Sequence, residues 1–254
     1  MKKFLALCSV IAIISLNSCN INIHGLNGNI TFDCIKKNNE TQTVDVNSIE
    51  KIKIDISVGD CNIIVGSSDK AVINTSCEYK AISEEKAQKA MDNTRLRCEA
   101  QGDTLHIDFI DSETGKNIKN NNAVNIITNI EVTLPDNLKS FEISTDVGDV
   151  DMDGFSGAFD VSSDVGDVTA NNLTITGKSD FSTDVGDIDL SLDILEKSEI
   201  NMSSDVGDIK LDTQGNNYEE ISSKKDTVSQ KKKIIVDGKC TVEMKTDVGD
   251  IKIK

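Results

Sequence analysis

The twelve residues FEISTDVGDVDM, numbered 141–152, contain a six-residue motif, TDVGDV, that the chain repeats almost unchanged. The five clear copies have glycines 18, 20, 21 and 42 residues apart, and the last interval reads as two periods with one degenerate or looped-out copy. A sixth, weaker copy lies upstream. The repeated glycines are Gly59, Gly148, Gly166, Gly186, Gly207 and Gly249. A fixed period of about 20 residues is typical of solenoids, in which each unit buries its apolar face against its neighbours.

Apolar and polar residues alternate on both sides of each glycine. In the first clear copy, Phe141 and Ile143 precede Gly148, and Val150 and Met152 follow it. A period of two predicts half-buried strands. The valine that directly precedes every glycine is counted among the inward apolar positions. With this valine facing inward, the alternation shifts by one residue at the glycine. Such a shift predicts a corner or bulge in which the glycine has positive φ. The sequence therefore predicts an all-β solenoid with rungs of about 20 residues, each built as strand, corner and strand.

The chain is acidic and long enough for a β-rich core. Its 254 residues include 37% hydrophobic residues, one Pro, 16 Gly and no Trp, which suffices for one or two cores. The 27 Lys and Arg residues against 43 Asp and Glu residues give a net charge of -16. A surface of this sign repels phosphate backbones, so we exclude nucleic acid from the expected partners.

The N-terminus predicts a location outside the cytoplasm. Lys2 and Lys3 precede an apolar stretch, residues 4–16, that is too short to span a bilayer, as in a secretory signal peptide. It ends in Leu-Asn-Ser-Cys, which resembles the lipobox of bacterial lipoproteins, with Cys19 as the lipid acceptor. The alternative is an ordinary cleaved signal with Cys19 as a bystander. The resulting assignment is a lipoprotein signal peptide at 1–18, a lipidated N-terminus and tether at 19–40, and a solenoid domain at 41–254.

The cysteines do not predict a disulfide scaffold. If Cys8 leaves with the signal and Cys19 is acylated, an odd number remains without a CxxC pair. The remaining cysteines are Cys34, Cys61, Cys77, Cys98 and Cys240. Cys61 occupies a column that elsewhere holds Val or Ile, as expected of a buried thiol acting as a small hydrophobe. Cys77 and Cys98 could pair across one hairpin, and the sequence leaves that question open.

A segment of different character separates the sixth copy of the motif from the other five. Ser83 and the two acids after it have the pattern of a helix N-cap and first turn, and the helix is expected to run to about Leu96. Strands are expected at residues 71–80, 104–110 and 125–134, and polar loops at 115–123 and within the 42-residue interval, with lysines 231–233 at a solvated tip.

The order of these elements carries a resemblance. The stretch IEKIKIDISVGDCNIIVGSSD, then a helix rich in Glu and Lys, then IEVTLPDNLKSFEISTDVGDVDM and further Gly-Asp strands is similar to the bacterial putative adhesin family of β-strand-repeat domains. The similarity covers roughly residues 41–254. It implies a right-handed β-solenoid, often secreted or attached to a membrane, and it supplies no catalytic residues. Because fold does not determine function, the adhesin label is an expectation only.

Acidic residues form two further columns in the repeat. Each clear copy carries Asp two residues before and one residue after its glycine, and both side chains are predicted to point outward. In successive rungs the carboxylates of one column would lie about 4.8 Å apart and repel each other by about 1 kcal/mol in water. Calcium could offset the repulsion, because Asp149, Asp151, Asp153 and Asp160 have the spacing of a calcium loop. The alternative, which we favour, is that Asp side chains accept hydrogen bonds from backbone amides at each corner. Calcium is the only candidate cofactor.

An enzyme is the competing hypothesis, because parallel β-helices include enzymes that cleave polysaccharides. The chain offers many acids but few bases. His24 lies in the predicted tether and His106 among strand residues, and no nucleophile or nucleotide-binding motif accompanies them. We therefore assign no catalytic residues.

Together these patterns predict a lipid-anchored surface for binding, adhesion or scaffolding at the bacterial cell envelope, on the extracytoplasmic face of the membrane. The expected partners are the membrane, through the lipid at Cys19, and an unidentified envelope protein or glycan. The alternative is a secreted carbohydrate-active β-helix enzyme. The sequence specifies neither the ligand nor the oligomeric state.

Overall fold

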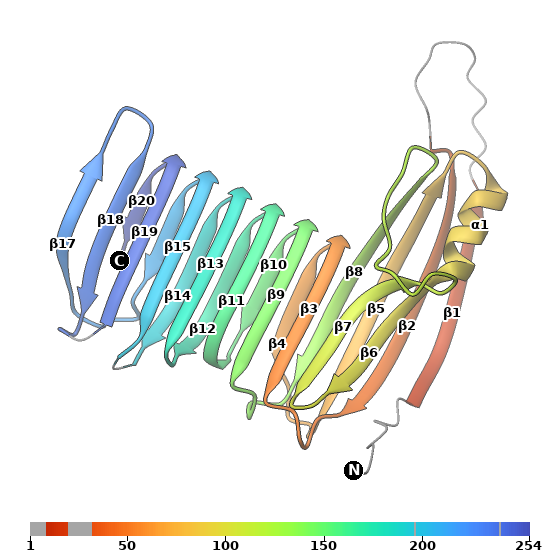
Figure 1. The fold of residues 1–254 in the computed structure, drawn as a ribbon, viewed down its shortest axis with the longest axis horizontal. Helices are drawn as coiled ribbons and strands as arrows, with labels where there is room; N and C mark the ends of the chain where they lie inside the picture. The colour runs from red at the N-terminus through yellow and green to blue at the C-terminus, as the bar shows by residue number, and fades with distance from the viewer. Residues whose placement is uncertain (1–8, 20–31, 196, 239) are drawn as a thin grey trace.

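The computed structural model describes residues 9–19, 32–195, 197–238 and 240–254. Its repeat region consists of two parallel sheets that face each other and are joined at one edge by the glycine corners (Figure 1). The first sheet contains the strands that precede the glycines: β3 (Lys51–Val58), β9 (Ser140–Val147), β11 (Ser156–Val165), β13 (Lys178–Val185), β15 (Glu199–Val206) and β19 (Cys240–Val248). The second sheet contains the strands that follow them: β4 (Cys61–Val65), β10 (Val150–Asp153), β12 (Val168–Ile175), β14 (Ile188–Ile194), β16 (Ile209–Asp212) and β20 (Ile251–Ile253).

The strand register follows the sequence repeat. In the first sheet Val165 pairs with Val147 and Val185, and in the second sheet Ile188 pairs with Val168 and Ile209. Equivalent motif positions therefore lie side by side in successive rungs. This alignment is why the motif recurs: each rung presents the same groups to the rung before it and the rung after it.

The 42-residue interval contains no extra rung among the described residues. β15 pairs directly with β19, and β16 directly with β20. The interval instead holds an antiparallel hairpin, β17 (Tyr218–Lys225) and β18 (Gln230–Val236), whose second strand pairs with β19. The predicted reading of two periods was wrong. So was the polar loop with lysines 231–233 at its tip, because these lysines lie within β18.

The N-terminal end of both sheets is antiparallel. Strand β8 runs parallel to β4 but antiparallel to β5, and β7 runs parallel to β3 but antiparallel to β6. Beyond β5 lie β2 and then β1, both antiparallel. The bounds are β1 (Ser9–Cys19), β2 (Cys34–Asp45), β5 (Lys70–Ala81), β6 (Thr94–Gln101), β7 (Thr104–Asp111) and β8 (Val124–Leu134). The strands predicted in this region are thus present, with ends that differ by one residue.

Helix α1 (Glu84–Asn93) begins where the sequence predicts and ends earlier. Ser83 is the N-cap, and its hydroxyl accepts a hydrogen bond from the Lys86 backbone N–H at 3.4 Å. The chain becomes extended at Thr94 rather than at Leu96. Leu96 is buried in β6, where the alternation of buried and open residues has already changed to a strand pattern.

A continuous apolar core fills the space between the two sheets. Phenylalanines from successive rungs stack within it: the rings of Phe141 and Phe159 lie 4.9 Å apart, and those of Phe159 and Phe181 lie 6.1 Å apart. All three are almost completely buried. The predicted inward column of the first sheet is therefore a column of core residues. Ser179 in this column is also buried, and its hydroxyl oxygen accepts the Phe159 backbone N–H at 3.0 Å.

The predicted N-terminal segments lie partly outside the described residues. Residues 1–8 of the assigned signal peptide and residues 20–31 of the assigned tether are not described. The backbone of β1 pairs with β2, with Cys19 opposite Cys34. Because β2 begins at Cys34, ordered structure starts before the domain boundary assigned at residue 41. The part of the chain that is described contains no helix that is both long and apolar enough to cross a membrane.

Candidate functional site

The glycine corners are fixed by both backbone conformation and space. The six repeat glycines have φ between +142° and +158°, which residues with a Cβ rarely adopt. A Cβ built on Gly186 would lie 2.0 Å from the carbonyl oxygen of Gly166 in the preceding rung. The corners therefore stack so closely that only glycine fits.

In the five clear copies of the motif, the hydroxyl residue three positions before the glycine supports this stacking. Thr183 Oγ1 donates to the Gly166 carbonyl oxygen at 2.8 Å, and Ser204 Oγ donates to that of Gly186 at 2.9 Å. The side chains of these residues are buried. Since an unpaired buried carbonyl is costly, the motif needs Ser or Thr at this position.

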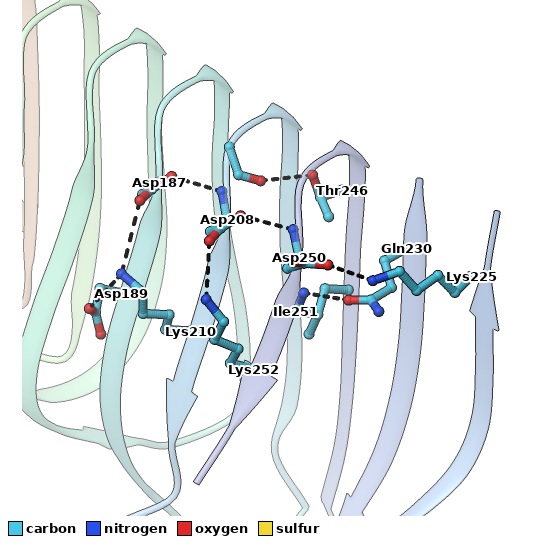
Figure 2. A network of polar contacts seen from close by, with 11 residues as sticks. Asp187, Asp189, Asp208, Lys210, Lys225, Gln230, Thr246, Asp250, Ile251 and Lys252 are labelled. Carbon is cyan, nitrogen blue, oxygen red and sulfur yellow. Dashed lines mark hydrogen bonds and ion pairs between the residues drawn. The ribbon is translucent and has the colours of Figure 1, made fainter. Parts of the chain in front are cut away.

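The aspartate after each glycine joins neighbouring rungs through its carboxylate. Asp187 Oδ1 accepts the backbone N–H of Asp208 at 2.7 Å, and Asp208 Oδ1 accepts that of Asp250 at 2.9 Å (Figure 2). The same bond joins Asp149 to Asp167 at 2.8 Å, and Asp167 to Asp187 at 2.7 Å. We call this series the aspartate ladder. The acids thus bind backbone amides, as expected from the sequence, but in the next rung rather than in their own corner.

Both ends of the aspartate ladder are closed by other side chains. At the first rung, Asn129 Oδ1 accepts the backbone N–H of Asp60 at 3.0 Å. At the last rung, the β17–β18 hairpin supplies the groups of a missing rung: Lys225 Nζ lies 2.6 Å from Asp250 Oδ1, and the Gln230 side chain accepts the Ile251 N–H (Figure 2). The Val228 carbonyl also accepts the Gly249 N–H at 3.2 Å. The hairpin is therefore a cap on the stack.

The valine before each glycine lies outside the core, contrary to the sequence prediction. The five valines are 45% to 48% exposed. They are Val147, Val165, Val185, Val206 and Val248. The alternation already breaks ahead of the glycine, because the Ser or Thr hydroxyl takes the last inward position and the next two residues, Asp and Val, both face outward.

The four acids of the predicted calcium loop are not brought together. Asp151 and Asp153 lie on β10 in the second sheet, whereas Asp160 lies on β11 in the first sheet, and Asp149 belongs to the aspartate ladder. Within the described ranges, no group of three or more His, Cys, Asp or Glu side chains is placed to hold a metal ion. The buried Val150 and Met152, alternating with these acids, make the segment a strand instead of a loop, which separates its acids.

Burial and neighbouring like charges raise the pKa of two carboxyl groups on the outer faces of the sheets. Partial burial first, and then the charges of Asp180 and Glu142, raise the pKa of Asp160 above its usual value. Burial and the charges of Asp149, Asp60 and Asp167 raise the pKa of Asp151 in the same way. Both carboxylates therefore oppose folding when they are ionised.

Replacing Asp160 by Asn should stabilise the protein at neutral pH only. Because the folded-state pKa of Asp160 is raised, its contribution to stability is fully present below the unfolded pKa, about 3.9, and is lost as the pH rises through the folded pKa. We expect Asp160→Asn to gain about 0.5 kcal/mol at pH 7 and nothing at about pH 3. Urea unfolding at both pH values measures this. Asp69→Asn, at an exposed carboxylate, is the control, and an equal gain for Asp160→Asn at both pH values would contradict the assignment.

A shallow polar hollow lies on the outer face of the second sheet, where the sheet changes from parallel to antiparallel. Its volume is about 530 Å³, and its wall includes Asn39, Asn62, Asn74, Asn129 and Glu131. Asn74 links two sides of the wall, because its Oδ1 accepts the Thr41 hydroxyl at 2.8 Å and its Nδ2 donates to Glu131 at 3.2 Å. Amide and carboxylate groups at fixed positions suit a ligand rich in hydroxyl groups. Sequence reasoning missed this hollow, because its residues come from four strands distant in the chain.

Two of the buried cysteines have thiols whose pKa is raised by burial. Cys77 lies on β5 in the second sheet and Cys98 on β6 in the first sheet, and the disulfide that the sequence left open does not form between them. Burial raises the pKa of the Cys77 thiol to about 11 and that of Cys61 to about 12, so both stay protonated at neutral pH. His106 lies within β7, and His24 lies outside the described residues.

These features define a β-strand-repeat domain of two stacked parallel sheets. The chain belongs to the Toastrack DUF4097 family, which it matches over residues 13–254. This confirms the family resemblance predicted from the order of the elements. No curated protein matches the chain significantly.

Similar solved structures include proteins from three bacteria. A putative cell adhesion protein from Clostridium sporogenes ATCC 15579 shares 15% identity with a TM-score of 0.43, covering 86% of this chain and 99% of that chain. A putative adhesin from Bacteroides fragilis NCTC 9343 shares 17% identity with a TM-score of 0.36, covering 85% and 97%. A putative adhesin from Parabacteroides merdae ATCC 43184 shares 12% identity with a TM-score of 0.28, covering 85% and 96%.

Proposed function

We propose that this protein is a lipid-anchored binding and scaffolding surface on the extracytoplasmic face of the bacterial cell membrane. Cys19 carries the lipid after removal of residues 1–18, and the stacked sheets project into the envelope. The coil of the chain is right-handed in this proposal, as connections between parallel strands almost always are. Its rungs of about 20 residues repeat a rigid unit rather than a reactive one.

One observation carries the proposal: the residues that recur in the copies of the motif hold successive rungs together. The Ser or Thr hydroxyl, the glycine and the second aspartate of each motif all bind or contact the neighbouring rung. The repeat therefore forms a long, regular outer surface, and its recurring polar groups bind the neighbouring rungs. The polar hollow offers this surface a place to hold a hydroxyl-rich envelope glycan.

The enzyme alternative finds less support. Asp55 and Asp108 are neighbours in the register of β3 and β7, and burial raises the pKa of Asp55, followed by the charges of Asp108 and Asp146. However, Arg97 Nε donates to Asp108 at 2.7 Å, and Asn117 donates to Asp55 at 3.0 Å. Both acids are thus engaged by neighbouring side chains. Release of reducing ends from envelope glycans by the purified protein would favour the enzyme instead.

The lipid anchor gives the first test. Cys19→Ala should abolish incorporation of a palmitate analogue and release the protein from the membrane fraction, because the acceptor thiol is gone. Cys8→Ala is the matched control and should keep both the label and the location, since Cys8 lies within the apolar part of the signal. Metabolic labelling followed by membrane fractionation measures both. Label retained in the Cys19→Ala protein would refute the anchor.

A further inference from the structure

A second hollow lies between helix α1 and the segment that joins β7 to β8. Its volume is about 660 Å³. Four lysines line it: Lys86, Lys89, Lys116 and Lys119. All four are exposed. We call this site the lysine hollow.

The lysine hollow is unusual for so acidic a chain. The net charge is -16, and many lysines elsewhere are paired, as Lys139 is with Glu50 at 2.7 Å. In the described part of the chain, no ion pair within 4.0 Å involves any of the four lysines of the hollow. Asp111 also lines the hollow, where the hydrogen bond from the Thr114 backbone N–H and, to a smaller extent, the charge of Lys89 lower the pKa of its carboxyl group. Four positive charges thus face this one negative charge. An excess of positive charge therefore remains.

The local fold keeps the four lysines together. Lys86 and Lys89 are three residues apart and so lie on one side of α1, with the buried Ala87 holding the helix against the sheet. The facing segment is fixed by Asn120, whose Oδ1 accepts the Ile126 N–H at 2.6 Å, and by Ile118, whose N–H donates to the Phe109 carbonyl at 3.0 Å. The lysines therefore line a formed concavity rather than a flat surface.

The lysine hollow also lies at the end of the domain that the proposed anchor reaches first. Strand β2 begins at Cys34, which pairs with Ala81, two residues before the N-cap Ser83 of α1 (Figure 1). Cys19 lies opposite Cys34 in the register of β1 and β2, so the acceptor of the proposed lipid lies at this end of the domain. Ile82, 44% exposed, lies beside the segment after the hollow, because its N–H donates to the Ala123 carbonyl at 3.2 Å. An exposed isoleucine next to lysines is a combination that suits a membrane surface.

We propose that the lysine hollow binds the phosphates of anionic lipid headgroups and docks the α1 end of the domain on the membrane. This inference rests on the proposed lipid anchor, which places the hollow near the bilayer. Each basic residue close to an anionic surface adds attraction, so four together add a second binding signal to the acyl chain. Docking would fix the orientation of the stacked sheets, which then point away from the membrane.

Vesicle sedimentation of the full chain tests the inference. Every sample carries Cys19→Ala, so that acylation plays no part. The test variant combines Lys86→Gln, Lys89→Gln, Lys116→Gln and Lys119→Gln. The control combines Lys224→Gln, Lys231→Gln, Lys245→Gln and Lys252→Gln, which removes the same charge at the opposite end. Vesicles are pure phosphatidylcholine or contain about one third phosphatidylglycerol.

We expect the test variant to bind the anionic vesicles at least about tenfold more weakly than the parent, and the control to stay within about twofold. Binding to the anionic vesicles should also fall as salt is added. Equal binding by test variant and control would overturn the inference. So would saturable binding of inorganic phosphate with no preference between the vesicles, which would identify a soluble anion as the ligand. Failure of the anchor would appear only in the labelling experiment, so the two outcomes are distinguishable.

Discussion

Gly186→Ala should lower the free energy of unfolding by about 3 kcal/mol or more, a large loss for one methyl group. Two costs combine at this corner. The backbone has φ of +158°, and the new Cβ would lie 2.0 Å from the Gly166 carbonyl oxygen. The position of the Cβ is fixed by the backbone of one rung, and the carbonyl oxygen belongs to the backbone of the rung before it. The clash is therefore relieved only if the two rungs move apart.

Gly177→Ala is the matched control because it isolates the backbone cost. Gly177 has φ of +100°, but its added Cβ would have no atom within 4 Å. We expect a loss of about 1 kcal/mol from backbone conformation alone. Chemical denaturation of both variants measures the difference. Equal losses would show that the corners do not stack as described.

Removing the β17–β18 hairpin should cause copies of the protein to associate with one another. The Asp237 N–H donates to the Asn217 carbonyl at 2.8 Å, so deletion of residues 218–236 leaves two chain ends that are already in contact. The deletion uncovers the edge of β19 and removes the buried Ile234 and Val236 from the core. An open edge beside apolar surface is a template for pairing with another chain.

Sedimentation velocity distinguishes the cap from an incidental insertion. The deletion variant should form large assemblies at concentrations where the parent gives one small species. Lys225→Ala is the control, because it removes one exposed ion pair and should cost less than about 1 kcal/mol without association. A deletion variant with the sedimentation and the unfolding midpoint of the parent would rule out the capping role.

The sequence predicted the features that depend on local pattern. The positive φ at the glycine columns and the alternation around Phe141 and Val150 are visible in the sequence of a single rung, and the structure places these residues at the corners and in the core. Helix α1 was predicted because its N-cap and acidic first turn are local signals. Its end was missed because strand pairing of Leu96 overrides helix propensity.

The features that depend on contact between rungs could not be predicted. The outward direction of Val185 follows from the buried hydroxyl of Thr183, which binds a carbonyl in another rung. The hairpin cap has the polar composition of a loop, and only its position beside β19 reveals that Lys225 and Gln230 complete the last corner. The predicted calcium loop was wrong for a related reason. The segment forms strand β10, and a strand separates acidic side chains that a loop would bring together.

Amide hydrogen exchange at Asp208 tests most directly whether the repeated aspartates join the rungs. The Asp208 N–H donates to Asp187 Oδ1 at 2.7 Å. Asp187→Ala removes this acceptor and should speed exchange at Asp208 by about fivefold, the equivalent of one hydrogen bond of about 1 kcal/mol. Asp187→Asn keeps an oxygen in place, as Asn129 does at the first rung, and should leave the exchange slow. Unchanged exchange at Asp208 in the Asp187→Ala protein would contradict the account.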